Sequence, residues 1–67
     1  MLYPRIKELR EENDFSQVEV AEFLHCTQAA YCFYEKGKRD IPTSVLISLA
    51  SLYRCSTDYI LGVSDVK

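Results

Sequence analysis

The sequence predicts a compact all-α fold of five short helices, and three observations carry this prediction. Apolar residues recur at helical spacing, Ser and Thr residues stand where helices would begin, and glycines stand where two helices would end. At 67 residues the chain has the length of one domain, so we expect a single domain over residues 1–67, with a short polar tail at residues 63–67.

The first helix begins at Pro4, because proline is tolerated in a first helical turn, where the backbone N–H that it lacks would have no partner. Ile6 and Leu9 recur three residues apart, so they share one face of this helix. Asn13-Asp14 interrupts the pattern and marks the end of the helix.

The second helix begins after Ser16, because Glu19 stands three residues later and completes a capping box. A stripe of apolar side chains follows and ends near His25. Its members are Val20, Ala21 and Leu24. Ala21 is small, which lets the second helix cross its neighbour closely.

The third helix begins after the cap residue Thr27 and ends at Gly37. The aromatic run AAYCFY, residues 29–34, has the composition of a buried strand. A cap before this run, a glycine after it and the lack of a second strand to pair with it favour a helix instead.

The fourth helix starts at the run Ile41-Pro42-Thr43, and its apolar residues share one face. These residues are Leu46, Leu49, Ala50 and Tyr53. We expect the ring of Tyr53 to pack and its hydroxyl to stay in water. The fifth helix is capped by Ser56, carries Asp58 in its first turn, where a carboxylate favours the helix dipole, and ends at Gly62.

The sequence offers little that an enzyme site requires. It holds one histidine, no glycine-rich nucleotide loop and no pair of carboxylates at a spacing typical of catalysis. Five small helices also leave little room for a pocket of the size that small ligands need. We therefore expect no enzymatic activity, no cofactor and no small-molecule ligand.

The cysteines predict neither a disulfide framework nor a metal site. Their number, three, is odd, no C-x-x-C pair occurs, and their spacings with His25 do not suit zinc. We expect Cys26 and Cys55 to be small buried hydrophobic residues. No signal peptide opens the chain and the longest apolar run has six residues, so we expect no membrane segment and a cytoplasmic location.

The spacing and charge of the second and third helices predict DNA binding. The connection around His25 is short, with the spacing of a helix-turn-helix unit over about residues 16–36, and such a unit lays its second helix in the major groove. The net charge of the chain is −2, yet the side chains of residues 25–39 sum to a positive charge. The preceding and following parts are both net negative, so the one basic segment coincides with the third helix and the loop after it.

The stretch SQVEVAEFLHCTQAAYCFYEKGKRDIP resembles the DNA-binding domain of phage Cro and repressor proteins, the Xre-like family. The matching residues, in order, are Ser16-Gln17, Ala21, Leu24, Thr27-Gln28, Tyr34-Glu35-x-Gly37 and Pro42. The likeness extends over about residues 3–62. It implies a lambda-repressor-like five-helix fold and a sequence-specific transcriptional regulator, a repressor, that places the helix from about Thr27 to Lys36 in the major groove of double-stranded DNA.

The resemblance also implies roles for individual residues. Gln17 would hold a phosphate with its amide, Gln28 would read an adenine edge, and Arg10 would form a structural pair with Glu35. The residues expected to bind DNA are Gln17, Thr27, Gln28, Ala29, Cys32, Phe33, Lys36, Lys38, Arg39 and Thr43.

Some residues depart from the family pattern. His25 replaces a glycine, so we expect a positive φ there, which histidine tolerates better than most residues. Cys32 and Phe33 are apolar where the family usually has polar or basic residues, and Phe23 on the second helix is apolar as well. The alternative function is therefore a protein-interaction module of the same fold, which binds another protein through an apolar face of Phe23, Cys32 and Phe33.

We also expect a weak homodimer, because regulators of this kind use two subunits on half-sites about one helical turn apart. Its interface would lie on the fourth and fifth helices and the tail. The expected contacts are Ile47, Val63 and Val66.

Overall fold

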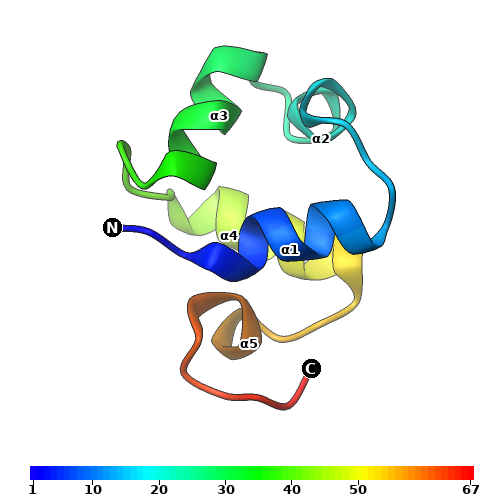
Figure 1. The fold of residues 1–67 in the computed structure, drawn as a ribbon, viewed down its shortest axis with the longest axis vertical. Helices are drawn as coiled ribbons and strands as arrows, with labels where there is room; N and C mark the ends of the chain where they lie inside the picture. Colours follow the sequence, from blue (N-terminus) through cyan, green and yellow to red (C-terminus); the bar gives the residue numbers. More distant parts are fainter.

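The computed structural model describes residues 1–67 and confirms the predicted fold class, because it consists of five α-helices and contains no strand (Figure 1). In chain order the helices are α1 (Pro4–Glu12), α2 (Gln17–Phe23), α3 (Gln28–Lys36), α4 (Thr43–Tyr53) and α5 (Thr57–Leu61). The longest has 11 residues, and none has the length and apolar character that a membrane crossing requires.

Three helices begin at the polar caps that the sequence predicts. Ser16 and Glu19 form the capping box, in which the Ser16 hydroxyl accepts from the Glu19 N–H at 3.1 Å and the Ser16 N–H donates to the Glu19 carboxylate at 2.9 Å. Thr27 and Ser56 each accept from the backbone N–H three residues further on. These bonds satisfy N–H groups that a first helical turn leaves free, so the starts of α2, α3 and α5 are fixed locally.

Each of the four connections between helices contains a residue in the left-handed conformation. Gly37 ends α3 with φ 72°, and His25, between α2 and α3, has φ 58°, as expected. Asp14 and Arg54 also have positive φ, 59° and 54°, which the sequence did not predict. A left-handed residue reverses the chain within one or two positions, which keeps these connections short.

The core is a cluster of eight buried apolar side chains to which all five helices contribute. They are Ile6, Leu9, Val20, Ala21, Tyr31, Tyr34, Leu49 and Ile60. Ala21 is only 2% exposed, where α2 packs on α3. Cys26 and Cys55 were expected to be buried, but both are half-buried at the edge of the core, because each lies in a turn after a helix and not within one.

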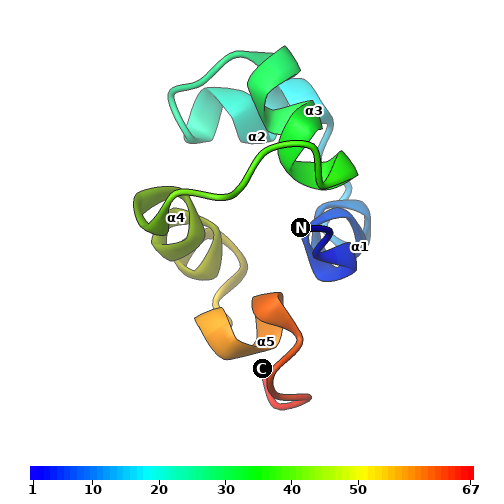
Figure 2. The same cartoon turned by 90° about the vertical axis from the view of Figure 1, so that its left-hand side faces the viewer.

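The helices α2 and α3 lie together at one end of the molecule and α5 lies at the other, with α1 and α4 between them (Figure 1 and Figure 2). Arg5 on α1 fixes the C-terminal tail beside α5. Its guanidinium donates to the carbonyl oxygens of Tyr59 and Ser64 and to the carboxylate of Asp65, and it lies 4.1 Å from the centre of the Tyr59 ring. The helix-turn-helix unit is therefore at the opposite end from the tail.

Candidate nucleic-acid interface

Exposed side chains of α3 and of the loop after it form the candidate interface. The exposed members of the predicted DNA-binding set are Thr27, Gln28, Ala29, Phe33, Lys36, Lys38, Arg39 and Thr43. Gln17 and Cys32 are half-buried. The structure thus leaves most of the predicted residues free to meet a ligand.

Gln17 and Gln28 are the first residues of α2 and α3, and their side chains are joined. Nε2 of Gln28 donates to Oε1 of Gln17 at 3.4 Å, and Nε2 of Gln17 donates to Oε1 of Glu35 at 3.0 Å. One N–H and the amide oxygen of Gln28 are left free. Together they form the donor–acceptor pair that matches the major-groove edge of adenine.

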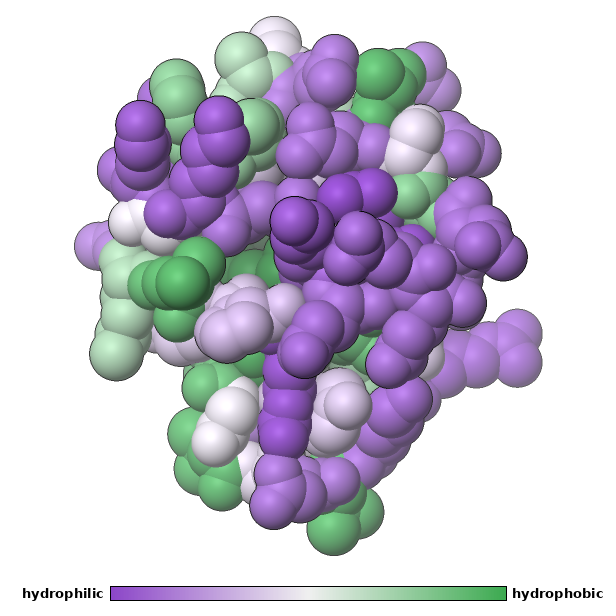
Figure 3. Space-filling view, in the orientation of Figure 1, coloured by the Kyte–Doolittle hydropathy of each residue, from purple (hydrophilic) through white to green (hydrophobic).

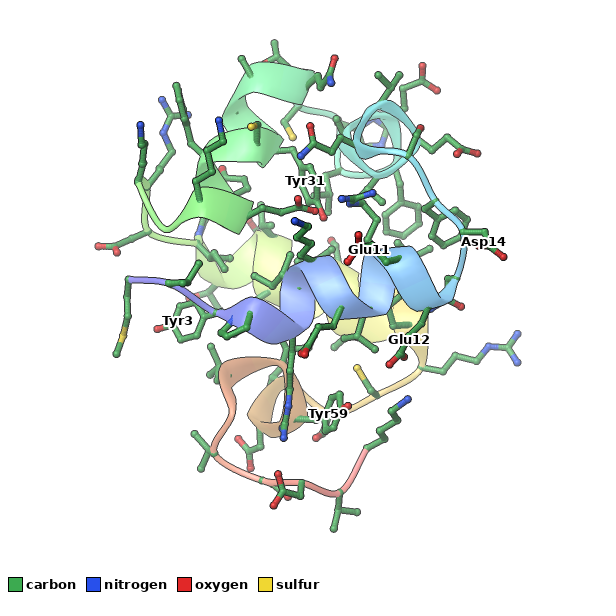
Figure 4. The ribbon with its side chains drawn as sticks, in the orientation of Figure 1. Tyr3, Glu11, Glu12, Asp14, Tyr31 and Tyr59 are labelled. Atoms are coloured by element: carbon green, nitrogen blue, oxygen red, sulfur yellow. The ribbon has the colours of Figure 1, made fainter.

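Glu35 anchors this network from inside the molecule, where it is 7% exposed. Its carboxylate accepts from Nε of Arg10 at 2.6 Å and from the hydroxyl of Tyr31 at 2.6 Å; Figure 4 shows Tyr31 between α3 and α1. Burial alone would raise the pKa of Glu35, but the hydrogen bonds from Arg10, Tyr31 and Gln17 outweigh it, so this pKa lies below its usual value. Arg10 and Glu35 are thus a buried ion pair that ties α1 to α3.

Two tyrosines share this buried region. Burial, together with the bond to the Glu35 carboxylate, raises the pKa of Tyr31, and burial raises the pKa of Tyr53 to about 12. The expectation that the Tyr53 hydroxyl stays in water was wrong, because its oxygen is buried and has no hydrogen-bond partner in the protein. The ring of Tyr53 packs against Phe15, with 6.3 Å between ring centres, and this contact holds the side chain inside.

The last residue of α3 and the loop after it present three cations without ion-pair partners. Lys36, Lys38 and Arg39 are exposed, and none of them takes part in an ion pair. The neighbouring carboxylate of Asp40 pairs instead with the ammonium group of Met1 at 3.3 Å. The positive charge of the loop is therefore available to an anionic ligand.

The start of α4 lies directly after this loop. Pro42 precedes the helix, and no side chain caps its first turn. The backbone N–H groups at Thr43 and the residues after it can therefore donate to an anion, which the helix dipole also favours.

The three apolar residues of the alternative hypothesis do not share one depression. Phe23 is 45% exposed and lines a hollow, whereas Phe33 lies beneath the guanidinium of Arg39. The hollow has a volume of about 450 Å³ and is lined by Phe15, Glu19, Val20, Glu22, Phe23 and Leu52. Neither Cys32 nor Phe33 lines it.

The expectation that five small helices leave little room for a pocket was wrong, because this hollow has a volume of several hundred Å³. It lies between α2, Phe15 in the connection before α2, and Leu52 of α4. Its lining contains two carboxylates, Glu19 and Glu22, but no histidine, cysteine or cation. No group of three or more His, Cys, Asp or Glu side chains is placed to hold a metal ion, and all three cysteines are free thiols.

Two contacts, one beneath the interface and one on it, were missed by sequence reasoning. The bond from Tyr31 to Glu35 joins residues four apart on one helix, so their spacing was a signal that could have revealed it. The contact of Phe33 with Arg39 depends on how the chain turns after Gly37, and no sequence pattern indicates it.

Comparisons with known proteins place this geometry among helix-turn-helix proteins. The profile of a family described as helix-turn-helix matches residues 6–60. In Bacillus subtilis strain 168, the HTH-type transcriptional regulator ImmR is 40% identical over 63 residues, which are 94% of this chain and 50% of that protein. The uncharacterized HTH-type transcriptional regulator YobD of the same strain is 34% identical over 65 residues, 97% of this chain and 58% of that protein. This chain thus spans about half the length of the curated relatives that it matches.

Solved structures share the fold. The crystal structure of the P22 c2 repressor protein in complex with a synthetic operator matches with a TM-score of 0.83 and 22% identity, over 96% of this chain and 98% of that one. The solution structure of the DNA-binding domain of the P22 c2 repressor matches with a TM-score of 0.82 and 22% identity, over 100% of this chain and 88% of that one. The five-helix arrangement predicted from the sequence is therefore that of the P22 c2 repressor DNA-binding domain.

Proposed function

The chain belongs to the helix-turn-helix family, and from this membership we propose that it is a transcriptional regulator, a repressor, that binds a specific sequence of double-stranded DNA in the cytoplasm. The helix from Thr27 to Lys36 would lie in the major groove. The observation that carries the proposal is the position of Gln28, which is exposed at the first position of α3 and tied to Gln17.

Gln28 is the residue proposed to read a base. Its free N–H would donate to N7 of an adenine, and its oxygen would accept from the N6 amino group. Gln17 would donate its second N–H to a phosphate, since the first is used by Glu35. The two glutamines thereby couple base reading to contact with the DNA backbone.

The remaining residues of the set would fix the protein on the duplex. Lys36, Lys38 and Arg39 supply positive charge, and Thr43 opens a helix whose N–H groups can meet a phosphate. The small side chains of Ala29 and Cys32 would let α3 approach the base edges, and the exposed ring of Phe33 would meet a thymine methyl. With so few cations, we expect modest affinity and a shallow dependence on salt.

A weak homodimer would place two copies of α3 on adjacent half-sites. Exposed apolar side chains on α4 and in the tail support this proposal, since Ile47 is 58% exposed, Val63 75% and Val66 78%. Figure 3 shows apolar side chains at the end of the molecule where α5 and the tail lie. Sedimentation would reveal the dimer, and a monomer throughout the high micromolar range would contradict it.

The first test is selection of bound duplexes from a random pool at about 150 mM salt. We expect enrichment of a palindromic site with half-sites about 10 base pairs apart. The matched control is the double variant Gln28→Ala/Lys38→Ala, whose substitutions lie on exposed positions and leave the core intact. A pool that stays unenriched while the protein remains folded would contradict the DNA-binding function.

A further inference from the structure

The contact between Phe33 and Arg39 is a feature of the interface that base reading and charge do not explain. The guanidinium carbon of Arg39 lies 5.5 Å from the centre of the Phe33 ring, within the range of a cation–π interaction. Phe33 is 38% exposed and Arg39 is exposed, so the pair is on the surface. The adjacent carboxylate of Asp40 is bound to the N-terminal ammonium group and does not compete for the guanidinium.

The backbone after α3 brings these two side chains together. The N–H of Gly37 donates to the carbonyl of Tyr34 at 3.3 Å, and the N–H of Lys38 donates to the carbonyl of Phe33 at 3.0 Å. This pair of bonds is a Schellman motif, in which a left-handed residue folds the chain back over the last helical turn. Arg39, one residue further on, is thereby returned to the side of α3 that carries Phe33.

We propose that Phe33 is a positioning residue, whose ring holds the guanidinium of Arg39 ready to bind a DNA phosphate at the edge of the groove. This inference rests on the proposed function. An exposed arginine side chain has many rotamers, and binding a phosphate from a free side chain would lose that freedom. Contact with the ring restricts the side chain before DNA arrives. The attraction is to the face of the ring, so it leaves the N–H donors of Arg39 for the phosphate.

The test compares two substitutions at position 33 in two backgrounds. Phe33→Tyr keeps an aromatic ring, and Phe33→Leu removes it while preserving an apolar side chain. Each is made with Arg39 present and with Arg39→Ala, and affinity is measured for random-sequence duplexes of about 30 base pairs, roughly three helical turns. Random sequence averages out base reading and reports phosphate contact. Circular dichroism confirms that every variant is folded.

We expect Phe33→Leu to weaken binding about two- to fivefold, in keeping with an exposed cation–π pair, and Phe33→Tyr to bind like the wild type. In the Arg39→Ala background, Phe33→Leu should cause no further loss, because leucine keeps an apolar side chain that can still meet a thymine methyl. Equal losses in both backgrounds would overturn the proposal, because the ring would then contribute to binding independently of Arg39. The proposal would also be overturned if Arg39→Ala weakened binding while Phe33→Leu did not. If the wild type bound no duplex at all, the proposed function would fail first, and this inference with it.

Discussion

The amide nitrogen of the Gln28 side chain lies 3.4 Å from the amide oxygen of Gln17, so the first residue of α3 is tied to the first residue of α2. Gln17 in turn donates to Glu35, whose carboxylate is paired with Arg10 in the interior. An unbroken line of hydrogen bonds therefore runs from a buried ion pair to the exposed start of α3. The orientation of Gln28 depends on the core of the protein as well as on its own helix.

Replacing Gln28 with alanine should reduce discrimination at one base pair. We expect Gln28→Ala to weaken binding to the selected duplex by about 1–3 kcal/mol, because a bidentate contact to one base is lost. The measurement is the affinity for the selected duplex and for duplexes with each base pair changed in turn. Equal losses on selected and random DNA would contradict the assignment of base reading to this residue.

Lys38→Ala should act differently, because a lysine that neutralises a phosphate carries no sequence information. We expect binding to all duplexes to weaken alike and the slope of log affinity against log salt to become shallower by about one. Lys7→Ala is the control, since Lys7 is an exposed lysine on α1, outside the proposed interface. A loss confined to the selected duplex, or an equal loss from the control, would speak against this role.

Glu35→Gln should lower the stability of the fold and change its dependence on pH. The substitution removes the charge that Arg10 and Tyr31 stabilise, so we expect the free energy of unfolding at neutral pH to fall by about 1.5–3 kcal/mol. The pKa of Glu35 is lowered in the folded state. Its contribution to stability is therefore complete above the unfolded pKa of about 4.3 and is lost as the pH falls through the lower folded value.

Urea unfolding from about pH 7 down to about pH 3 measures this dependence. The wild type should lose stability more steeply than Glu35→Gln as the solution is acidified through this range. The control Glu8→Gln, at an exposed position on α1, should follow the wild-type curve. Parallel curves for the wild type and Glu35→Gln would show that the carboxylate is not stabilised by its partners.

The parts of the fold that depend on local chemistry could be predicted from the sequence. Ser16, Thr27 and Ser56 begin helices because their hydroxyls satisfy nearby N–H groups, which requires no knowledge of tertiary structure. Gly37 reverses the chain because glycine adopts positive φ without steric cost, whereas the positive φ of His25 was expected from the family pattern, which has glycine at that position. These signals fix the starts of α2, α3 and α5 and the end of α3.

Contacts between residues far apart in the chain could not be predicted in this way. Arg5 binds α5 through Tyr59 and the tail through Ser64, and Tyr53 buries its hydroxyl against expectation, because both depend on how separate helices come together. Asp14 and Arg54 take positive φ although their residue types do not require it. At the candidate site, the positions of the residues on their helices indicated which of them would be exposed. The hydrogen-bond and contact partners of their side chains depended on tertiary packing.

Ala21→Leu should damage folding, because Ala21 is 2% exposed where α2 meets α3 and the crossing has no space for added carbon atoms. We expect a loss of about 1–3 kcal/mol in the free energy of unfolding. The matched control is Ala29→Leu, the same substitution at an exposed position of α3, which should change stability by less than about 0.5 kcal/mol. Similar thermal unfolding of the two variants would show that the crossing tolerates a larger residue.

Comparing Gly37→Ala with Gly62→Ala distinguishes the cost of backbone strain from the cost of a steric contact. Both glycines have positive φ, 72° and 80°, so each substitution should lower the free energy of unfolding by about 1–2 kcal/mol through strain alone. At Gly37 the new Cβ would also lie 2.9 Å from the Cα of Leu2, whereas at Gly62 it would meet nothing within 4 Å. Gly37→Ala should therefore be the more destabilising of the two in urea unfolding, and it should also weaken DNA binding, because the loop that carries Lys38 must shift. Equal effects on stability would show that the N-terminal residues move aside and do not hold this turn.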